Sequence, residues 1–169
     1  MMGLVRMMLV VLIAAAAVLA DTSLADAIAI GQVAPSLIAL AALVWTMAAP
    51  GPYAFLAAGA IALAGDLFAP GRDGAGAASM LLVAYAAGRL QQRFVADHFA
   101  LEVPIVLVGT GVWVLATDLL RWVSGDVSLS PLVLLGQVPA VAAYTAAVAL
   151  PVLMVAGWVR EGTASKLAG

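Results

Sequence analysis

Long apolar runs dominate this chain and restrict what it can fold into. Hydrophobic residues make up 66% of its 169 positions and charged residues only 9%. A typical soluble domain is about half apolar and about a quarter charged. A water-soluble fold of this length cannot bury so much apolar surface, whereas about 20 apolar residues suffice to cross about 30 Å of hydrocarbon. The sequence therefore predicts an all-α integral membrane protein.

Breaks of Pro, Gly and charge divide the chain into six apolar windows. The predicted spans cover roughly residues 4–20, 28–49, 53–69, 75–94, 103–123 and 132–158. Pro139 and Pro151 lie inside the last window, where each removes a backbone donor and is expected to kink the helix. No connection is long enough to fold separately, so we expect residues 1–169 to form one six-helix transmembrane domain.

The basic residues predict the orientation. Six spans place both termini on one side of the membrane, and that side collects five of the seven basic residues: Arg6, Arg89, Arg93, Arg160 and Lys166. Cytoplasmic loops carry the excess of Lys and Arg, so both termini are expected on the cytoplasmic side of the membrane. The stretch from Arg6 to Ala20 also fits a cleavable signal peptide, although we expect a retained helix.

Composition excludes several classes of function. The net charge of −2 gives no electrostatic basis for binding nucleic acid. The chain has no Cys and a single histidine, His98, so a metal site is not expected. No nucleophile, base or carboxylate cluster indicates an active site. We expect no catalytic residue, no metal and no cofactor.

The informative residues are the ionisable ones inside predicted spans, because each costs roughly 3 kcal/mol or more near the bilayer centre. Asp66 follows Gly65 near the end of the third window, and Asp118 lies near the end of the fifth. Arg121 is three residues after Asp118 and can pair with it on one helix face. One interpretation is a proton or cation site. The interpretation we favour is a set of structural or assembly residues that fix helix packing.

Two further patterns lie in the fourth window. Arg89, Arg93 and Asp97 are spaced four apart where the helix leaves the membrane, which fits anchoring or the docking of a cytoplasmic partner or anionic lipid. Ala84 and Gly88 are also four apart, a spacing that lets helices approach closely. Ala84, Gly88, Arg89 and Arg93 are therefore the candidate partner contacts.

The middle of the chain resembles a known family. A Gly-Asp-Leu element ends one span, a short glycine-containing loop follows, the next helix ends in Tyr and Arg, and a later span carries an Asp. The matching residues lie within 53–125: Gly59, Gly65-Asp66-Leu67-Phe68, Gly74, Gly76, Tyr85, Gly88-Arg89, Arg93-Phe94, Asp118 and Leu119-Leu120-Arg121-Trp122. This order resembles the MreD family, the rod-shape-determining membrane proteins of bacteria. The Ala-rich spans and the loop at residues 70–73 depart from the family pattern.

The resemblance implies a six-helix fold similar to the substrate-binding subunits of energy-coupling-factor transporters. It implies a multi-pass protein of the bacterial inner membrane that acts as a non-enzymatic scaffold of the elongasome, which maintains rod shape and synthesises side-wall peptidoglycan. The implied partner is an MreC-like single-span membrane protein. The RodA glycosyltransferase, a class-B penicillin-binding protein and MreB would be close by.

Two other functions fit the same composition. One is the substrate-binding subunit of a vitamin transporter of the energy-coupling-factor type, which needs an outward-opening ligand pocket. The other is a small ion-coupled carrier that uses Asp66 and Asp118. Vitamin binding and pH-gradient-dependent transport, respectively, would distinguish them from a scaffold.

Overall fold

A computed structural model describes residues 2–24, 27–30, 33–48, 54–68, 74–94, 102–125 and 131–167, with side chains for all of these except 2–6, 94, 131–135 and 155–167. Within these residues the chain is all-helical. The helices are α1 (Met2–Ser23), α2 (Leu37–Ala48), α3 (Ala54–Phe68), α4 (Ala75–Phe94), α5 (Glu102–Val123) and α6 (Pro131–Leu167). The predicted all-α fold is confirmed.

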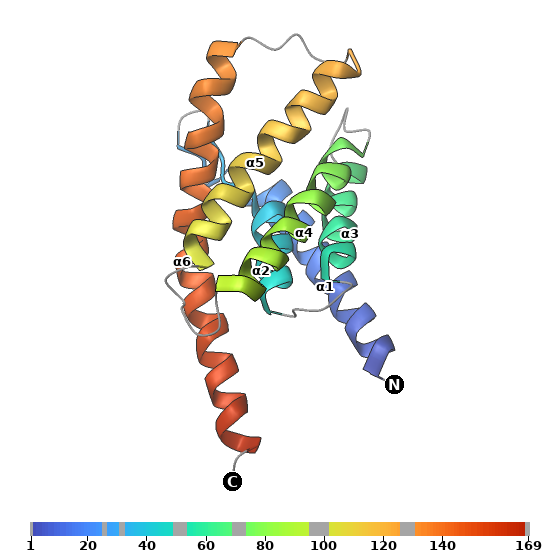
Figure 1. The fold of residues 1–169 in the computed structure, drawn as a ribbon, viewed down its shortest axis with the longest axis vertical. Coiled ribbons are helices and arrows are strands. Elements are labelled where there is room, and N and C mark those ends of the chain that lie inside the picture. The colour runs from blue at the N-terminus through green and yellow to red at the C-terminus, as the bar shows by residue number, and fades with distance from the viewer. Residues whose placement is uncertain are drawn as a thin grey trace.

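The six helices alternate in direction. α1, α3 and α5 rise in the view of Figure 1, and α2, α4 and α6 descend. α2 is the central helix, because it packs against each of the other five. The remaining contacts join α1 to α3, α3 to α4, α4 to α5 and α5 to α6. Helices that follow each other in the chain are antiparallel, as the short connections of a helical bundle require, whereas the contacts of α1 with α3 and of α2 with α4 and α6 are parallel.

The start of α2 differs from the sequence prediction. The second span was expected from Ile28, but the helix begins at Leu37, after Pro35. Proline disfavours helical geometry at the preceding residue, so the chain enters the helix only after it. Ser36 then acts as the N-cap, since its Oγ accepts a hydrogen bond from the Ala39 amide at 3.3 Å. Asp21, near the end of α1, accepts a hydrogen bond at its Oδ1 atom from the Leu37 backbone amide, at 3.0 Å.

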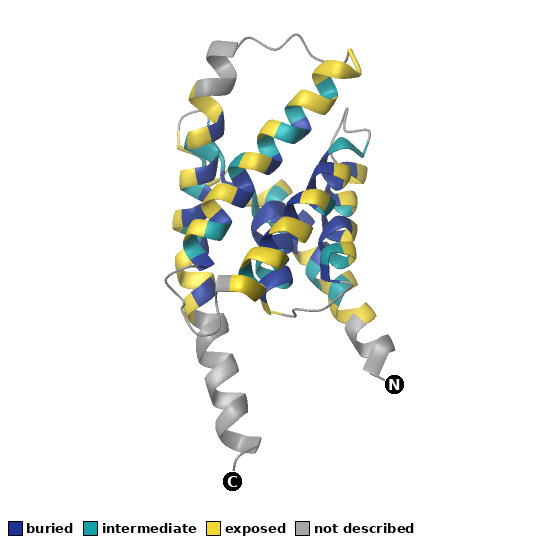
Figure 2. Cartoon of the chain, in the orientation of Figure 1, coloured by how far each residue is buried: buried dark blue, intermediate teal, exposed yellow. Residues whose placement is uncertain are grey.

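The core lies where α2 meets the other helices. Figure 2 shows buried residues concentrated along the facing sides of the helices and exposed ones on the outer sides. The buried α2 residues are Ile38, Ala39, Leu40, Ala42, Leu43, Thr46 and Met47. Gly109 of α5 is close to Leu43, so that a Cβ on Gly109 would lie 3.0 Å from the Leu43 Cδ1 atom. Glycine at this crossing therefore lets α5 approach the central helix.

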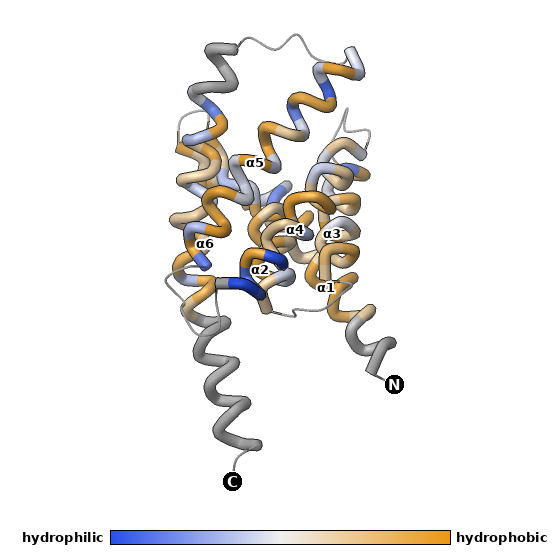
Figure 3. The backbone as a smooth tube through the Cα atoms, in the orientation of Figure 1, coloured by the Kyte–Doolittle hydropathy of each residue, from blue (hydrophilic) through white to orange (hydrophobic). Residues whose placement is uncertain are grey.

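Among the residues that the structure describes, two helical stretches are long and apolar enough to cross a membrane: α5 and Gly136–Met154 of α6. Shorter apolar helices cover Met7–Ser23, Leu37–Ala48 and Ala54–Phe68. Hydrophobic residues cover much of the tube in Figure 3, including the outer faces. Pro139 and Pro151 lie inside α6, which continues through both positions.

Candidate functional site

Asp66 connects the end of α3 to the start of α4. Its side chain is buried, with 5% of its surface exposed. Its Oδ2 atom accepts a hydrogen bond from the Ala77 backbone amide at 2.9 Å. The first amides of a helix lack intrahelical partners and carry the positive end of the helix dipole, so a carboxylate there is stabilised. Asp66 therefore acts as a cap for α4 supplied by the preceding helix.

Gly76 gives this carboxylate the space that it occupies. A Cβ at Gly76 would lie 2.5 Å from the Asp66 Oδ1 atom and 3.1 Å from its Cγ atom. Gly74, just before α4, has a φ of +79°, a conformation that glycine adopts without steric cost. The Gly-containing loop of the sequence thus has two structural functions: Gly74 forms the turn, and Gly76 lets the carboxylate reach the helix.

Trp113 joins α5 to the same turn. Its indole Nε1 donates a hydrogen bond to the Gly76 carbonyl at 2.8 Å, and the ring is buried. A buried indole N–H requires such an acceptor. The sequence indicated only that Trp113 lies inside a span, away from the membrane interface. The structure explains this position, because the ring bridges two helices.

Two hydroxyls extend these contacts along α4 and α5. The Ser79 and Thr117 oxygens are 2.7 Å apart, and the Thr117 hydroxyl is 2.8 Å from the Trp113 carbonyl. Both side chains are buried. We call Asp66, Gly76, Ser79, Trp113 and Thr117 the polar joint. It fastens α3, α4 and α5 to one another by hydrogen bonds between groups that lipid or an apolar core cannot satisfy.

The structure brings only part of the predicted intramembrane set into the joint. Asp66 belongs to it, and Gly65 packs against Ile38 of α2 instead. Asp118 and Arg121 follow Thr117 on α5, are half-buried, and each has an interaction partner. Their pairing with each other stays a prediction. Ser79 and Thr117 were missed, since single hydroxyls in an apolar helix give no distinctive sequence signal.

Arg89 and Arg93 lie exposed at the opposite end of α4. The Arg89 Nε and Nη2 atoms each donate to the Tyr85 hydroxyl at 3.2 Å, and the guanidinium carbon lies 5.5 Å from the centre of the Tyr85 ring. Tyr85 in turn contacts Phe55 edge-on, with ring centres 5.8 Å apart. The expected third member of the charge ladder, Asp97, lies outside the described residues.

The partner contact expected at Ala84 stays a prediction, and the described chain leaves it no exposed surface. Ala84 is 0% exposed and belongs to the hydrophobic core. A Cβ on Gly88 would lie 3.6 Å from the Thr46 Cγ2 atom, so Gly88 faces α2. The small residues at this spacing do allow close helix approach, but the helix that approaches is the chain's own. Of the expected contact residues, Gly88 is half-buried and Arg89 and Arg93 are exposed.

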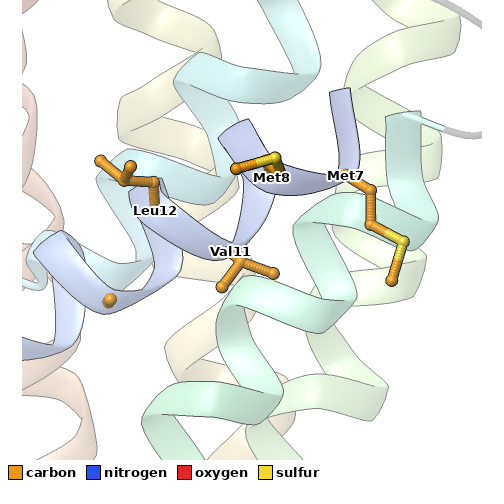
Figure 4. A pocket seen from close by; sticks show the side chains of 5 residues that line it. Met7, Met8, Val11 and Leu12 are labelled. Atoms are coloured by element: carbon orange, nitrogen blue, oxygen red, sulfur yellow. The ribbon is translucent and has the colours of Figure 1, made fainter. Parts of the chain in front are cut away.

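The outer face of α1 carries an open apolar hollow of about 420 Å³. Its lining residues are Met7, Met8, Val11, Leu12 and Ala15 (Figure 4). An apolar hollow of this kind suits hydrocarbon and offers no group to orient a polar ligand.

Among the described residues, no group of three or more His, Cys, Asp or Glu is placed to hold a metal ion. Comparison with protein-family models, with curated proteins and with solved structures finds no match to this chain.

Proposed function

We propose that this chain is a non-enzymatic membrane scaffold of the bacterial cell-wall elongation machinery, of the kind that the MreD resemblance implies. One observation carries the proposal. Two residues of the family-like stretch, Asp66 and Gly76, belong to the polar joint: the carboxylate accepts a hydrogen bond from the Ala77 amide at 2.9 Å and occupies space that a Cβ on Gly76 would fill. These residues thus have a role in helix packing, which is what a scaffold needs.

The placement in the membrane is part of the proposal. α5 and Gly136–Met154 would supply two spans and the three shorter apolar helices three more, and α4 would be the sixth. Large apolar side chains are exposed on five of the helices, as lipid-facing surfaces require: they include Val11, Leu12, Leu56, Leu82, Val112, Leu115 and Val152. The alternating helices bring the start of α1 to the end of the bundle where α4 finishes with Arg89 and Arg93 (Figure 1).

The joint weighs against the carrier alternative. A coupling site must release its ion, usually near the midplane on a broken helix. Asp66 is held by the Ala77 amide and confined by Gly76 and is 5% exposed. A carboxylate in this position contributes more to helix packing than to ion exchange.

Co-purification tests the proposal. A tagged chain is co-expressed with the MreC-like single-span protein of the same bacterium, and we expect a stable complex after extraction in mild detergent. Depletion of the chain should turn rod-shaped cells round. A matched control replaces Leu82, an exposed lipid-facing residue of α4, with Val and should bind as well as the parent chain.

The same preparation tests the alternatives. If the chain stays monodisperse and binds no elongasome protein but is stabilised by a vitamin, the transporter-subunit function replaces the scaffold. Proton-coupled uptake into proteoliposomes that is lost in Asp66→Asn would establish the carrier.

A further inference from the structure

One exposed face of α4 changes from apolar to basic along the helix. Leu82 and Ala86 are exposed on this face, and Arg89 and Arg93 continue it toward the end of the helix. Residues three and four apart lie on the same side of an α-helix, so these four side chains form one stripe. The end of α4 is also hydrophilic in Figure 3. The stripe therefore has an apolar part and a cationic part.

Tyr85 holds the first of these arginines in place. The Arg89 Nε and Nη2 atoms each donate to the Tyr85 hydroxyl at 3.2 Å, and the guanidinium carbon lies 5.5 Å from the centre of the ring. Phe55 of α3 packs edge-on against the same ring, with the two ring planes at 85°. A guanidinium that is already oriented loses less conformational freedom when it binds a ligand.

The Arg89 guanidinium keeps its positive charge and most of its donors. It carries five N–H groups, and the neutral Tyr85 hydroxyl accepts two of them. Described acidic side chains near either end of α4 lie elsewhere: Asp66 binds the Ala77 amide at the start of α4, and Glu102 of α5 is buried with 4% exposed. The charge is therefore available to an external anion.

The two parts of the stripe match the two parts of one kind of molecule. An exposed apolar helix face suits an acyl chain, and the planar fork of a guanidinium matches the oxygens of a phosphate group. An acidic peptide would match only the charge. We propose that Tyr85, Arg89 and Arg93 bind the headgroup of an anionic phospholipid, whose acyl chain lies along α4 beside Leu82.

This inference rests on the membrane placement within the proposed function and goes beyond the scaffold role, because it needs no protein partner. Basic side chains near a membrane surface attract anionic lipid in general. What distinguishes a built site is Tyr85, which carries no charge but orients Arg89. General attraction would depend on the arginines alone, whereas a site also depends on the tyrosine hydroxyl.

Fluorescence quenching by labelled lipid tests the site, and the chain has no native Cys to interfere. A fluorophore is attached to Leu82→Cys, a position 73% exposed, or to Val112→Cys of α5, 48% exposed, as the control position. The purified chain is reconstituted without a partner into phosphatidylcholine vesicles. These contain increasing amounts of phosphatidylglycerol or phosphatidylcholine with a nitroxide on the acyl chain.

We expect phosphatidylglycerol to quench the label at position 82 at a several-fold lower mole fraction than phosphatidylcholine does. The two lipids should quench the label at position 112 alike. Equal quenching by the two lipids at position 82 would overturn the inference. Quenching at position 112 but not at position 82 would mean that protein covers this face of α4, and would also overturn it.

Substitutions in the Leu82→Cys chain identify the groups responsible. Arg89→Gln and Arg93→Gln should each remove most of the preference for phosphatidylglycerol. Tyr85→Phe keeps the ring and should reduce the preference without abolishing it, because Arg89 is no longer held. Gln92→Ala, at an exposed uncharged position of the same turn, is the control and should keep the full preference. A preference unchanged in Tyr85→Phe would indicate general attraction and reject the site.

Two further outcomes separate this inference from its neighbours. Inorganic phosphate at matched ionic strength should leave the preference intact, and its loss would assign the arginines to free phosphate and reject the lipid. If neither label is quenched in either kind of vesicle, the chain does not lie in the bilayer, and the membrane placement fails together with the site. Failure of the single-span protein to co-purify would reject the scaffold role and leave the quenching result unchanged.

Discussion

The Asp66 carboxylate and Gly76 are in such close contact that a single added carbon on the glycine would lie 2.5 Å from the Asp66 Oδ1 atom. The other carboxylate oxygen, Oδ2, accepts a hydrogen bond from the Ala77 backbone amide. The pair thus combines a helix cap with a steric requirement. A change of Asp66 to Asn removes the charge and keeps a hydrogen-bond acceptor. A change of Gly76 to Ala adds one carbon and so tests the space that the carboxylate needs.

Asp66→Asn should be mild and Asp66→Leu damaging. The Asn side-chain oxygen can still accept the Ala77 amide, whereas Leu leaves that buried donor without its partner, at a cost of about 1–3 kcal/mol. The measurements are thermal unfolding in detergent and the level of protein in the membrane. If Asn is as damaging to cell shape as Leu while the protein stays abundant, the charge itself matters and the carrier function regains support.

Gly76→Ala should destabilise the chain although alanine is the better helix former. The added methyl group meets the Asp66 carboxylate, and relieving such an overlap in a packed site costs about 1–3 kcal/mol. Gly111→Ala is the matched control, since a Cβ there would make an ordinary 3.6 Å contact with the Ala142 Cβ atom. It should be neutral or slightly stabilising. Equal melting temperatures for the two variants would contradict the geometry of the joint.

Trp113→Phe should weaken the contact between α4 and α5. Phenylalanine keeps much of the ring but removes the N–H that donates to the Gly76 carbonyl at 2.8 Å. The expected loss is about 0.5–1.5 kcal/mol, the net contribution of one hydrogen bond, because the Gly76 carbonyl keeps its bond from the Ser79 hydroxyl at 3.2 Å. Trp122→Phe, at an exposed tryptophan of the same helix, is the control and should unfold like the parent chain. An unchanged melting temperature for Trp113→Phe would show that the bond contributes little.

The helices could be predicted from the sequence because an apolar window is a local property. The starts of α4 and α5 were predicted to within a residue. The start of α2 was predicted too early, although Pro35 and Ser36 mark it locally. The hydrogen bonds that Asp21 and Thr145 accept at this start come from amides 16 and 109 residues away and could not be predicted from the sequence. The joint was missed for the same reason. Asp66 stood out as a charge in an apolar helix, but Ser79, Trp113 and Thr117 become partners only when three helices meet.

Gly88→Leu should destabilise the chain itself and not only its complexes. A side chain at position 88 points toward Thr46 of the central helix, where a Cβ already has a 3.6 Å contact. The larger Leu would push α4 away from α2, whereas Ala should fit. Unfolding of the isolated chain distinguishes these effects from a partner contact. If Gly88→Leu keeps full stability and loses only co-purification, the glycine faces a partner after all.

Reporter fusions should find both termini in the cytoplasm. A reporter fused after Lys166 is expected on the cytoplasmic side, and one inserted between residues 124 and 130 on the outer side. The reason is electrostatic: Arg6, Arg89, Arg93, Arg160 and Lys166 would share the cytoplasmic side, against Arg72 and Arg121 opposite. The alternating helices of Figure 1 place the ends of α3 and α5 together, opposite the end of α4, as this arrangement requires. A reporter after Lys166 that is found on the outer side would contradict this topology.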